Sequence, residues 1–422
     1  MAFKFDWDIE SELEDASTPG ASTSAETASG FTGNVPKLKV QDSDGKERTS
    51  YKEIALEELI DSLPPVISYS NLEVPLTKAG KPTGEIATIL RRDLFDARFQ
   101  LANESDCSDD EGSAYGNHFP RCQSPTKGTG FSSNADLVKG VYEGGLKTWE
   151  ASLDLVDCLH EQGFRSGGKT VQGERLFEAG CGTAMPTVYL LEALFRNLLH
   201  KHRSKEECSK TVIHLQDYNS EVVLYITFCN IVLAYWSAKR SMTRLMPGRP
   251  PAPTPSLPAS TKTVRDSVLS HEIAFSAEED AEMEVNELPL TSELIETFKS
   301  FLELNNVELR FFVGSWHELP IPLEAYSIVL TSETVYELDN LPYLTDLLHQ
   351  ISMTKNHPAK TRDQLTLVAC KRVYFGVGGG EFAFKAEVGA RGEVNNIWHS
   401  SHGVERTVLR VEWDENYSKG KE

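Results

Sequence analysis

The chain has 422 residues, 40% of them hydrophobic, and a formal net charge of −21, so it can bury at least one substantial core but is not expected to hold nucleic acid through broad phosphate neutralisation. Its seven scattered cysteines form no CxxC pair, so the sequence indicates neither a disulfide framework nor a zinc ribbon and predicts a reducing compartment, cytosolic or nuclear. The acidic N-terminus and the lack of a long apolar run predict that the chain is neither secreted nor membrane-spanning.

Composition divides the chain into four parts. Residues 1–50 are rich in Ser, Thr, Gly, Asp and Glu, and such a segment buries too little apolar area to offset chain entropy, so we predict a disordered acidic tail. Apolar residues return over 51–105 and predict an ordered N-terminal extension. A polar linker is expected over 106–135. The main folded domain is expected over 136–415.

Apolar segments of strand length and helix length alternate through this domain. The expected strands are 174–180, 211–217, 307–314, 326–333, 364–371 and 406–413. The expected helices are 185–200, 221–240, 344–353 and one from about 382. This alternation predicts a parallel sheet with helices on both faces. The Pro-rich and acidic segment 246–287 is predicted to be a disordered insertion, and 416–422 a short tail.

The first strand of the domain ends in a glycine-containing turn, and ligands bind beyond the carboxyl ends of parallel strands. Gly180 and Gly182 permit a tight turn with close backbone approach, and the next helix offers its N-terminus. A dinucleotide GxGxxG register would need glycine where Met185 stands, which disfavours a pyrophosphate. Glu178 suits a positively charged ligand, such as the amino and sulfonium groups of S-adenosylmethionine. The alternative is an ordinary glycine turn.

Polar residues also follow the next three strands. Asp217 is placed to accept hydrogen bonds from both ribose hydroxyls of a nucleoside, or to cap the following helix. Gly314 admits close approach, and Trp316 lies against an adenine or serves packing. The fourth strand ends where an acceptor would enter, with helix capping as the alternative explanation. Its polar residues are Ser332, Glu333, Thr334 and Tyr336.

Several longer stretches together resemble the eukaryotic protein-histidine methyltransferase family, in its fungal form. They are DLVKGVYEGGLKTWEASLDLVDCL, FEAGCGTAMPTVYLLEALF, LQDYNSEVVL, FFVGSW, LTSETVY and KRVYFGVGGG. The segment ILRRDLFDARFQLANE (89–104) is similar to the extension that precedes the family's catalytic domain. The resemblance covers about 60–105 and 136–413, and departs at Ala179, where relatives more often carry Leu. It implies the Rossmann-like α/β fold of seven-strand S-adenosylmethionine-dependent methyltransferases, with helices on both faces.

The resemblance also implies a set of site residues, and no metal. S-adenosylmethionine would be held by Trp149, Glu178, Gly180, Cys181, Gly182, Asp217, Gly314, Trp316 and Ser332. Glu333, or a backbone carbonyl near Tyr336, would accept a hydrogen bond from the ring nitrogen of the acceptor that is not methylated. Thr334 would face the acceptor as well. Residues 374–380 would form another wall of the cleft, with substrate backbone close over their glycines.

The activity implied by the resemblance is N-methylation of one histidine in a basic large-subunit ribosomal protein, the universal one whose loop approaches the peptidyl transferase centre. It implies location in cytoplasm and nucleus, without direct binding to nucleic acid or membrane. A lysine methyltransferase and a catalytically silent module that binds a basic ribosomal protein remain as alternatives. A nicotinamide oxidoreductase is disfavoured by Met185 and by the lack of an acidic residue about 20 positions after the glycines.

Overall fold

The structure is a computed structural model. It describes residues 39–41, 47–49, 51–106, 145–201, 209–244, 286–319, 324–353, 364–400, 403–414 and 417. The described residues belong to one unit, Lys37–Glu422. The expected linker after residue 106, the start of the expected domain at 136–144, residues 416 and 418–422 of the short tail, and most of the predicted tail and insertion lie outside the described residues.

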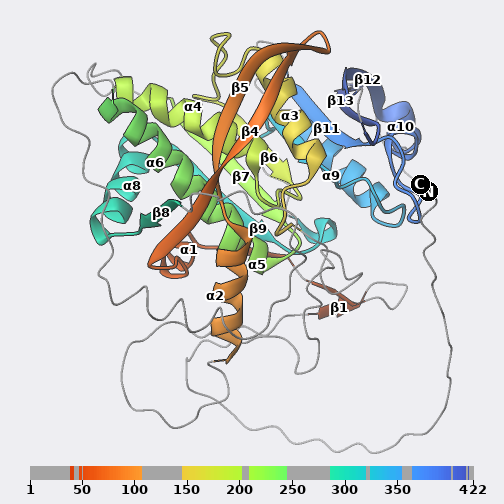
Figure 1. Cartoon of the computed structure of the whole chain (residues 1–422). Helices are drawn as coiled ribbons and strands as arrows, with labels where there is room; N and C mark the ends of the chain where they lie inside the picture. The colour runs from red at the N-terminus through yellow and green to blue at the C-terminus, as the bar shows by residue number, and fades with distance from the viewer. Residues whose placement is uncertain are drawn as a thin grey trace, which may run out of the picture. The chain divides into compact units, whose positions relative to one another are not determined.

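An eight-stranded sheet forms the centre of the domain (Figure 1). Its strands in chain order are β3 (Lys52–Ile54), β6 (Arg175–Ala179), β7 (Thr211–Asp217), β9 (Val307–Val313), β10 (Ile328–Ser332), β11 (Leu365–Lys371), β12 (Gly392–His399) and β13 (Arg406–Trp413). The order across the sheet is β12-β13-β11-β10-β6-β7-β9-β3. The strands from β11 to β9 run parallel, whereas β12, β13 and β3 pair antiparallel.

The domain therefore has a seven-strand methyltransferase sheet, with β3 added at one edge by the N-terminal extension. This confirms the predicted α/β fold. The sequence analysis missed β12, because alternate positions of this edge strand are exposed and polar, among them Glu393 and Asn395. The strand order reverses between β6 and β10, which marks the place where a ligand is expected.

Helices cover both faces of the sheet, because successive strand residues point to opposite sides. Leu176 packs in the core beneath α3, α4, α6 and α8, whereas Phe177 packs in the core formed with α9 and α10. The bounds of these helices are α3 Glu150–Glu161, α4 Met185–Lys201, α6 Phe228–Arg244, α8 Ser292–Leu304, α9 Leu341–Ser352 and α10 Glu381–Val388. The 23-residue helical stretch Ser220–Met242 is long and apolar enough to span a membrane, but 83% of its apolar window is buried inside the protein.

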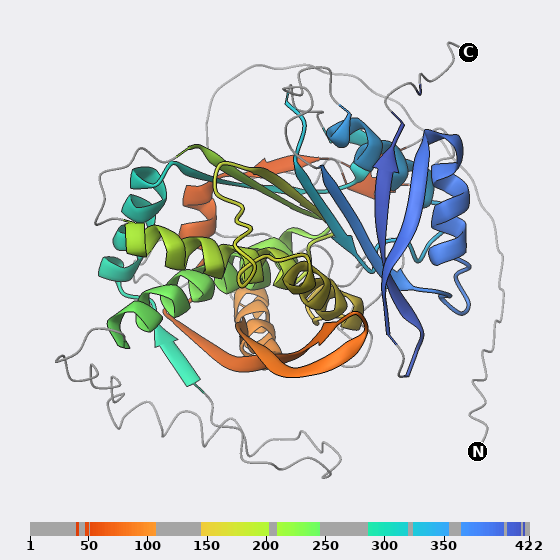
Figure 2. The same cartoon turned by 90° about the horizontal axis from the view of Figure 1, so that it is seen from above.

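The N-terminal extension forms a further layer. Its long hairpin consists of β4 (Val66–Lys78) and β5 (Lys81–Arg92), flanked by α1 (Leu56–Asp61) and α2 (Leu94–Asp106). The hairpin, orange in Figure 2, covers the outer side of the helical layer that contains α3, α4 and α6.

Two short pieces of strand lie where the sequence predicted disorder. β8 (Asn286–Pro289) pairs with β4, so the last two residues of the predicted insertion are part of a sheet. β1 (Lys39–Gln41) pairs with β2 (Glu47–Thr49) inside the predicted tail. The Asp-Gly turn signal between these strands is visible in the sequence. The pairing of β8 is not, because its partner strand lies far away in the chain.

Candidate active site

The turn after β6, which we call the glycine loop (residues 180–184), requires glycine at position 180 and favours it at 182. Gly180 and Gly182 have φ angles of 58° and 51°, in the left-handed region that side chains disfavour. A Cβ on Gly180 would lie 2.4 Å from Cγ2 of Thr334, and one on Gly182 would lie 3.4 Å from the Cα of Gly145. The loop is therefore enclosed by the strand-end segment after β10 and by the chain leading into α3.

Gln216, next to the end of β7, ties three strand ends together. Its side-chain oxygen accepts hydrogen bonds from the Gly180 N–H at 3.1 Å and from the Trp316 indole at 2.7 Å. Its side-chain nitrogen donates to the Gly314 carbonyl at 2.8 Å. Sequence analysis named all three partners but missed Gln216. Its signal was a polar side chain inside a buried strand, where a partner is obligatory.

The carboxylate of Asp217 joins the backbone of the glycine loop to the segment that follows β7. One oxygen accepts from the Gly182 N–H at 2.8 Å and the other from the Asn219 N–H at 3.1 Å. Burial raises the pKa of Asp217 to about 6, although these hydrogen bonds oppose the shift. Two carboxylate oxygens offer about four acceptor positions, so these contacts leave capacity for ribose hydroxyls.

Glu178 is buried beneath the loop and is only partly satisfied. One oxygen accepts from the backbone N–H and the hydroxyl of Thr187, the N–H at 3.2 Å. The other oxygen is buried without a hydrogen-bond partner among the described residues. Burial raises the pKa of Glu178 to about 7, Thr187 opposes the shift and the charge of Asp217 adds to it. Two buried carboxyls at neighbouring strand ends, Glu178 of β6 and Asp217 of β7, fit a ligand that carries positive charge, as S-adenosylmethionine does.

Cys181 and the segment before α3 complete the surroundings of the loop. The Cys181 N–H donates to the Gln216 carbonyl at 2.8 Å, and its thiol is buried. The Thr148 hydroxyl donates to Thr183 at 3.1 Å. This contact brings the predicted residue Trp149, at the N-cap of α3, close to the loop.

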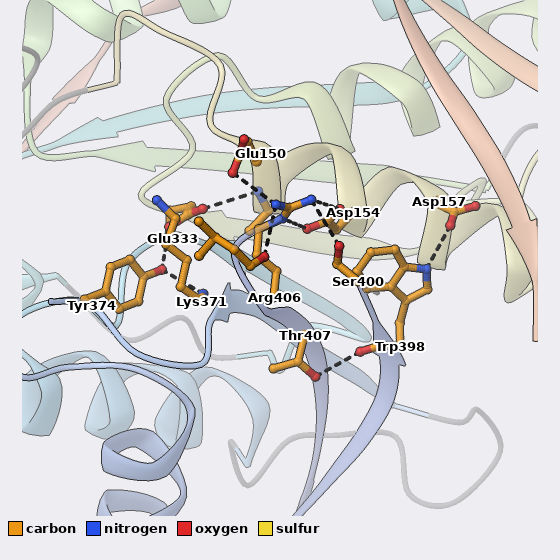
Figure 3. Close-up of polar contacts among 12 residues, drawn as sticks. Glu150, Asp154, Asp157, Glu333, Lys371, Tyr374, Trp398, Ser400, Arg406 and Thr407 are labelled. Carbon is orange, nitrogen blue, oxygen red and sulfur yellow. Dashed lines mark hydrogen bonds and ion pairs between the residues drawn. The ribbon is translucent and has the colours of Figure 1, made fainter. Parts of the chain in front are cut away.

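Glu333 lies just after β10 and connects α3 to the segment that contains Tyr374 (Figure 3). One carboxylate oxygen accepts from the Ala151 N–H in the first turn of α3 at 3.3 Å. The other accepts from the Tyr374 hydroxyl at 2.5 Å. Burial raises the pKa of Glu333, opposed by Tyr374 and by the charge of Lys371. The Lys371 ammonium lies 5.2 Å from the ring centre of Trp149.

Arg406 extends this polar cluster in Figure 3 and was missed by the sequence analysis. Its guanidinium binds the Asp154 carboxylate, with Nη2 to Oδ1 at 3.3 Å, and contacts Glu150 at 3.1 Å. Asp154 and Glu150 lie on α3, so Arg406 fixes this helix to β13. The partners lie 252 and 256 residues away in sequence, and no local pattern reveals them.

The other residues predicted to lie where the methylated side chain enters are beside Glu333. Ser332 is the last residue of β10, and Thr334 covers Gly180. The ring of Tyr336 meets that of Tyr374 edge to face, with centroids 6.3 Å apart. The structure thus brings the predicted residues to one edge of the sheet. Their contacts with cofactor and acceptor stay predictions.

The glycines after Tyr374 contact the chain's own backbone, whereas contact with a substrate backbone was expected. Gly379 and Gly380 donate backbone hydrogen bonds to the carbonyls of Tyr336 and Val335 at 3.0 and 2.8 Å. A Cβ on Gly379 would lie 2.2 Å from the Val335 carbonyl oxygen. Close approach of the chain's own backbone therefore requires glycine at 379, whereas the sequence analysis invoked a substrate backbone.

Comparison with solved structures finds methyltransferases at low similarity. The magnesium protoporphyrin IX methyltransferase of Synechocystis, with bound SAH, has a TM-score of 0.29 at 10% identity and covers 62% of this chain and 81% of that one. A SAM-dependent methyltransferase from Aquifex aeolicus has a TM-score of 0.27 at 12% identity, with coverages of 62% and 93%. No family model matches the chain.

Comparison with curated proteins finds sequence relatives that share one name. Histidine protein methyltransferase 1 of Saccharomyces cerevisiae is 30% identical over 339 residues, which cover 77% of this chain and 76% of the relative. The Schizosaccharomyces pombe protein of the same name is 25% identical over 341 residues, 78% of each chain. The Bos taurus homologue is 29% identical over 290 residues, 67% of this chain and 58% of the relative. By this identity and coverage, the chain belongs to the histidine protein methyltransferase family.

Proposed function

We propose that this S-adenosylmethionine-dependent methyltransferase modifies one histidine of a basic large-subunit ribosomal protein. The observation that carries the proposal is the position of Glu333 beside the glycine loop. β10 and β6 are neighbours in the sheet, and Thr334 packs directly on Gly180. A carboxylate able to orient an acceptor ring therefore lies next to the expected donor site, in a chain whose curated relatives are named for histidine.

The chemistry requires placement more than proton abstraction. S-adenosylmethionine supplies a methyl group on a sulfonium, and transfer is an in-line displacement, so the protein must exclude water and hold the acceptor nitrogen in line. A histidine with a pKa of about 6.5 is mostly neutral at neutral pH, and one of its ring nitrogens already has a free lone pair. No strong base is required.

In the proposed reaction, Glu333 accepts a hydrogen bond from the ring nitrogen that is not methylated. This contact selects the tautomer and stabilises the imidazolium as it forms. The Tyr374 hydroxyl and the Ala151 N–H hold the carboxylate in place, and its remaining lone pairs stay open to the ring. The alternative was a backbone carbonyl near Tyr336. The carbonyls of Tyr336 and Val335 accept from the N–H groups of Gly379 and Gly380 at 3.0 and 2.8 Å, so we assign the role to Glu333.

Exposed apolar side chains beside the site support a polypeptide as the substrate. Phe375 is 90% exposed, next to Tyr374 in sequence. Other exposed apolar residues of the two neighbouring segments are Leu338, Val373, Val377 and Phe382. The bridge between Glu337 and Gly378 holds these segments together. Clustered exposed apolar residues mark surfaces that bind proteins.

The charge of the chain favours a basic, unassembled substrate. A net charge of −21 attracts a free ribosomal protein, whereas an assembled ribosome presents RNA phosphate and repels the enzyme. Methylation would then occur in the cytoplasm or nucleus before the protein joins the ribosome.

Lysine is the competing acceptor. A lysine must lose a proton at a pKa of about 10.4 before it can attack, and a buried carboxylate such as Glu333 has the chemistry to take part. A module that only binds the ribosomal protein is the other alternative. The names of the curated relatives favour histidine.

The test is to identify the labelled residue. The purified chain would be incubated with labelled S-adenosylmethionine and free large-subunit ribosomal proteins from cells that lack the activity, and the product would be examined by mass spectrometry. The expected result is a label on one histidine of one basic protein. A label on lysine would contradict the acceptor, and cofactor binding without any label would favour the binding module.

A further inference from the structure

The helix that follows β7 is irregular where it passes beneath the glycine loop. After α5 (Ser220–Val222) the chain forms a π-helical turn, η1 (Val223–Thr227), before α6 begins. A π turn interrupts the regular hydrogen-bond ladder and is frequent at functional sites. Here the Tyr225 carbonyl accepts a hydrogen bond from Nη1 of Arg92 at 2.5 Å. Arg92 is the last residue of β5, so a side chain of the N-terminal extension supports the irregular turn.

Two residues of this helix hold the backbone of the glycine loop. The Thr227 hydroxyl donates to the Gly182 carbonyl at 2.7 Å, and the Asn230 amide donates to the Thr183 carbonyl at 2.9 Å. Both side chains are fully buried. The Asn230 side-chain oxygen also accepts from the Arg92 N–H at 2.8 Å. Asn230 thus connects the extension directly to the loop.

The guanidinium of Arg92 is enclosed by the protein. The whole residue is 2% exposed. Its Nε donates to the Asp96 carboxylate at 2.7 Å and its Nη2 to the Gln100 side chain at 2.9 Å. Burying a charged group is costly unless its hydrogen bonds are satisfied. An apolar side chain would pack the end of a hairpin at lower cost, so the pattern of contacts points to a role in fixing η1 and the loop above it.

We infer that Arg92, Thr227 and Asn230 are positioning residues for the cofactor, and that the N-terminal extension is thereby a working part of the cofactor site. Thr227 and Asn230 hold the carbonyls of Gly182 and Thr183, and Arg92 supports them through Asn230 and the Tyr225 carbonyl. Asp217 holds the Gly182 N–H. The inference rests on S-adenosylmethionine as the ligand of the loop and is independent of the acceptor residue.

The decisive variant is Thr227→Val. Valine keeps the shape of the side chain and removes the hydroxyl that donates to Gly182. Arg92→Met is the companion variant in the extension. Arg310→Met is the matched control. It breaks an ion pair with Glu53 that also connects the extension to the sheet, through two contacts of 2.7 Å each. Arg310 lies on β9 at an exposed position.

The readouts are the Kd for S-adenosylhomocysteine by calorimetry, hydrogen exchange of residues 180–184, and the melting temperature. We expect Thr227→Val and Arg92→Met to weaken binding at least tenfold and to speed exchange in the loop, with wild-type values for Arg310→Met. In turnover assays the KM for S-adenosylmethionine should rise, whereas kcat should keep its wild-type value.

Wild-type affinity in Thr227→Val would overturn the inference. This holds even if Arg92→Met does not fold and cannot be measured. An equal loss of affinity in Arg310→Met would overturn it too, since the effect would then be general destabilisation. If the wild-type chain itself did not bind S-adenosylhomocysteine, the cofactor assignment would fail and this inference with it. A label on lysine in the acceptor experiment would leave it intact.

Discussion

At the scale of single residues, Asp217 holds the Gly182 N–H of the glycine loop and is predicted to accept ribose hydroxyls as well. We expect Asp217→Ala to weaken S-adenosylhomocysteine binding by about 1.5 to 3 kcal/mol, since charge-assisted hydrogen bonds are lost. Calorimetric titration measures the change. Glu308→Ala, which removes an exposed ion pair between Glu308 of β9 and Lys210 just before β7, should bind like wild type. Unchanged affinity in Asp217→Ala would remove this residue from the site.

The two raised pKa values predict how cofactor affinity depends on pH. Burial raises the pKa of Glu178 to about 7 and that of Asp217 to about 6 in the protein without ligand. A bound cation favours the ionised carboxylates and lowers both pKa values, so binding must displace protons at low pH. Affinity should therefore rise from about pH 5 to about pH 8, and binding near neutral pH should release protons.

Calorimetry in buffers of different ionisation enthalpy measures that proton release. Glu178→Gln should remove the part of the pH dependence that lies near pH 7, because the amide does not titrate. An affinity independent of pH, or proton uptake on binding, would show that the ligand's positive charge does not lie near these carboxyls.

A substitution of Glu333 is expected to lower turnover without weakening cofactor binding. Glu333→Gln keeps an oxygen that can accept from Tyr374 or Ala151, so fold and cofactor affinity should be preserved. The neutral amide stabilises a developing imidazolium poorly, and loss of one charged hydrogen bond, about 1.5 to 3 kcal/mol, corresponds to a fall in kcat of roughly tenfold or more. Steady-state kinetics beside calorimetry checks this. A fall in cofactor affinity with unchanged kcat would place Glu333 on the donor side.

The sequence revealed those site residues whose place follows from strand pattern alone. Gly180, Asp217 and Glu333 follow or end parallel strands, and parallel strands end at one edge, so their proximity was predictable. Residues that act through distant partners were not. Gln216 and Gly180 are 36 positions apart, and Arg92 and Asn230 are 138 apart. No spacing rule connects side chains across such distances.

At the scale of elements, the local sequence pattern also failed to predict β8 and β12. The parallel strands are rich in apolar residues and were recognised, because most of their residues are buried. β12 is an edge strand with polar residues. β8 has four residues, Asn286–Pro289, and its pairing with β4 depends on a hairpin more than 200 positions earlier.

The position of β8 sharpens a prediction about the insertion. Residues 246–285 should be replaceable by a short Gly/Ser linker without loss of melting temperature or methylation, because loop closure changes by only about 0.6 kcal/mol for each doubling of length. Thermal melting and turnover measure both. A deletion that also removes Asn286–Pro289 should lower the melting temperature, since β4 loses its pairing partner. A large loss with the shorter deletion would mean that the insertion is packed or contacts the substrate.

At the scale of the whole molecule, the negative charge predicts a dependence on salt. Methylation of a free basic protein should slow as ionic strength rises, because attraction between exposed charges is screened beyond roughly 8 Å at physiological salt. The KM for the protein substrate measures this effect. The Kd for S-adenosylhomocysteine serves as the internal control and should change little, since Glu178 and Asp217 are buried. Equal salt dependence of both constants would contradict long-range attraction.

The pairing of the extension with late strands has a consequence for biosynthesis. β4 pairs with β8, and Lys52 of β3 pairs with Val313 of β9. The extension therefore leaves the ribosome before its partner strands β8 and β9 have been translated. Until then its strand edges are open to pairing with other chains. A nascent chain therefore cannot complete both the sheet and its cofactor site until these later strands have been translated, and a chaperone that shields the extension would shorten the period at risk.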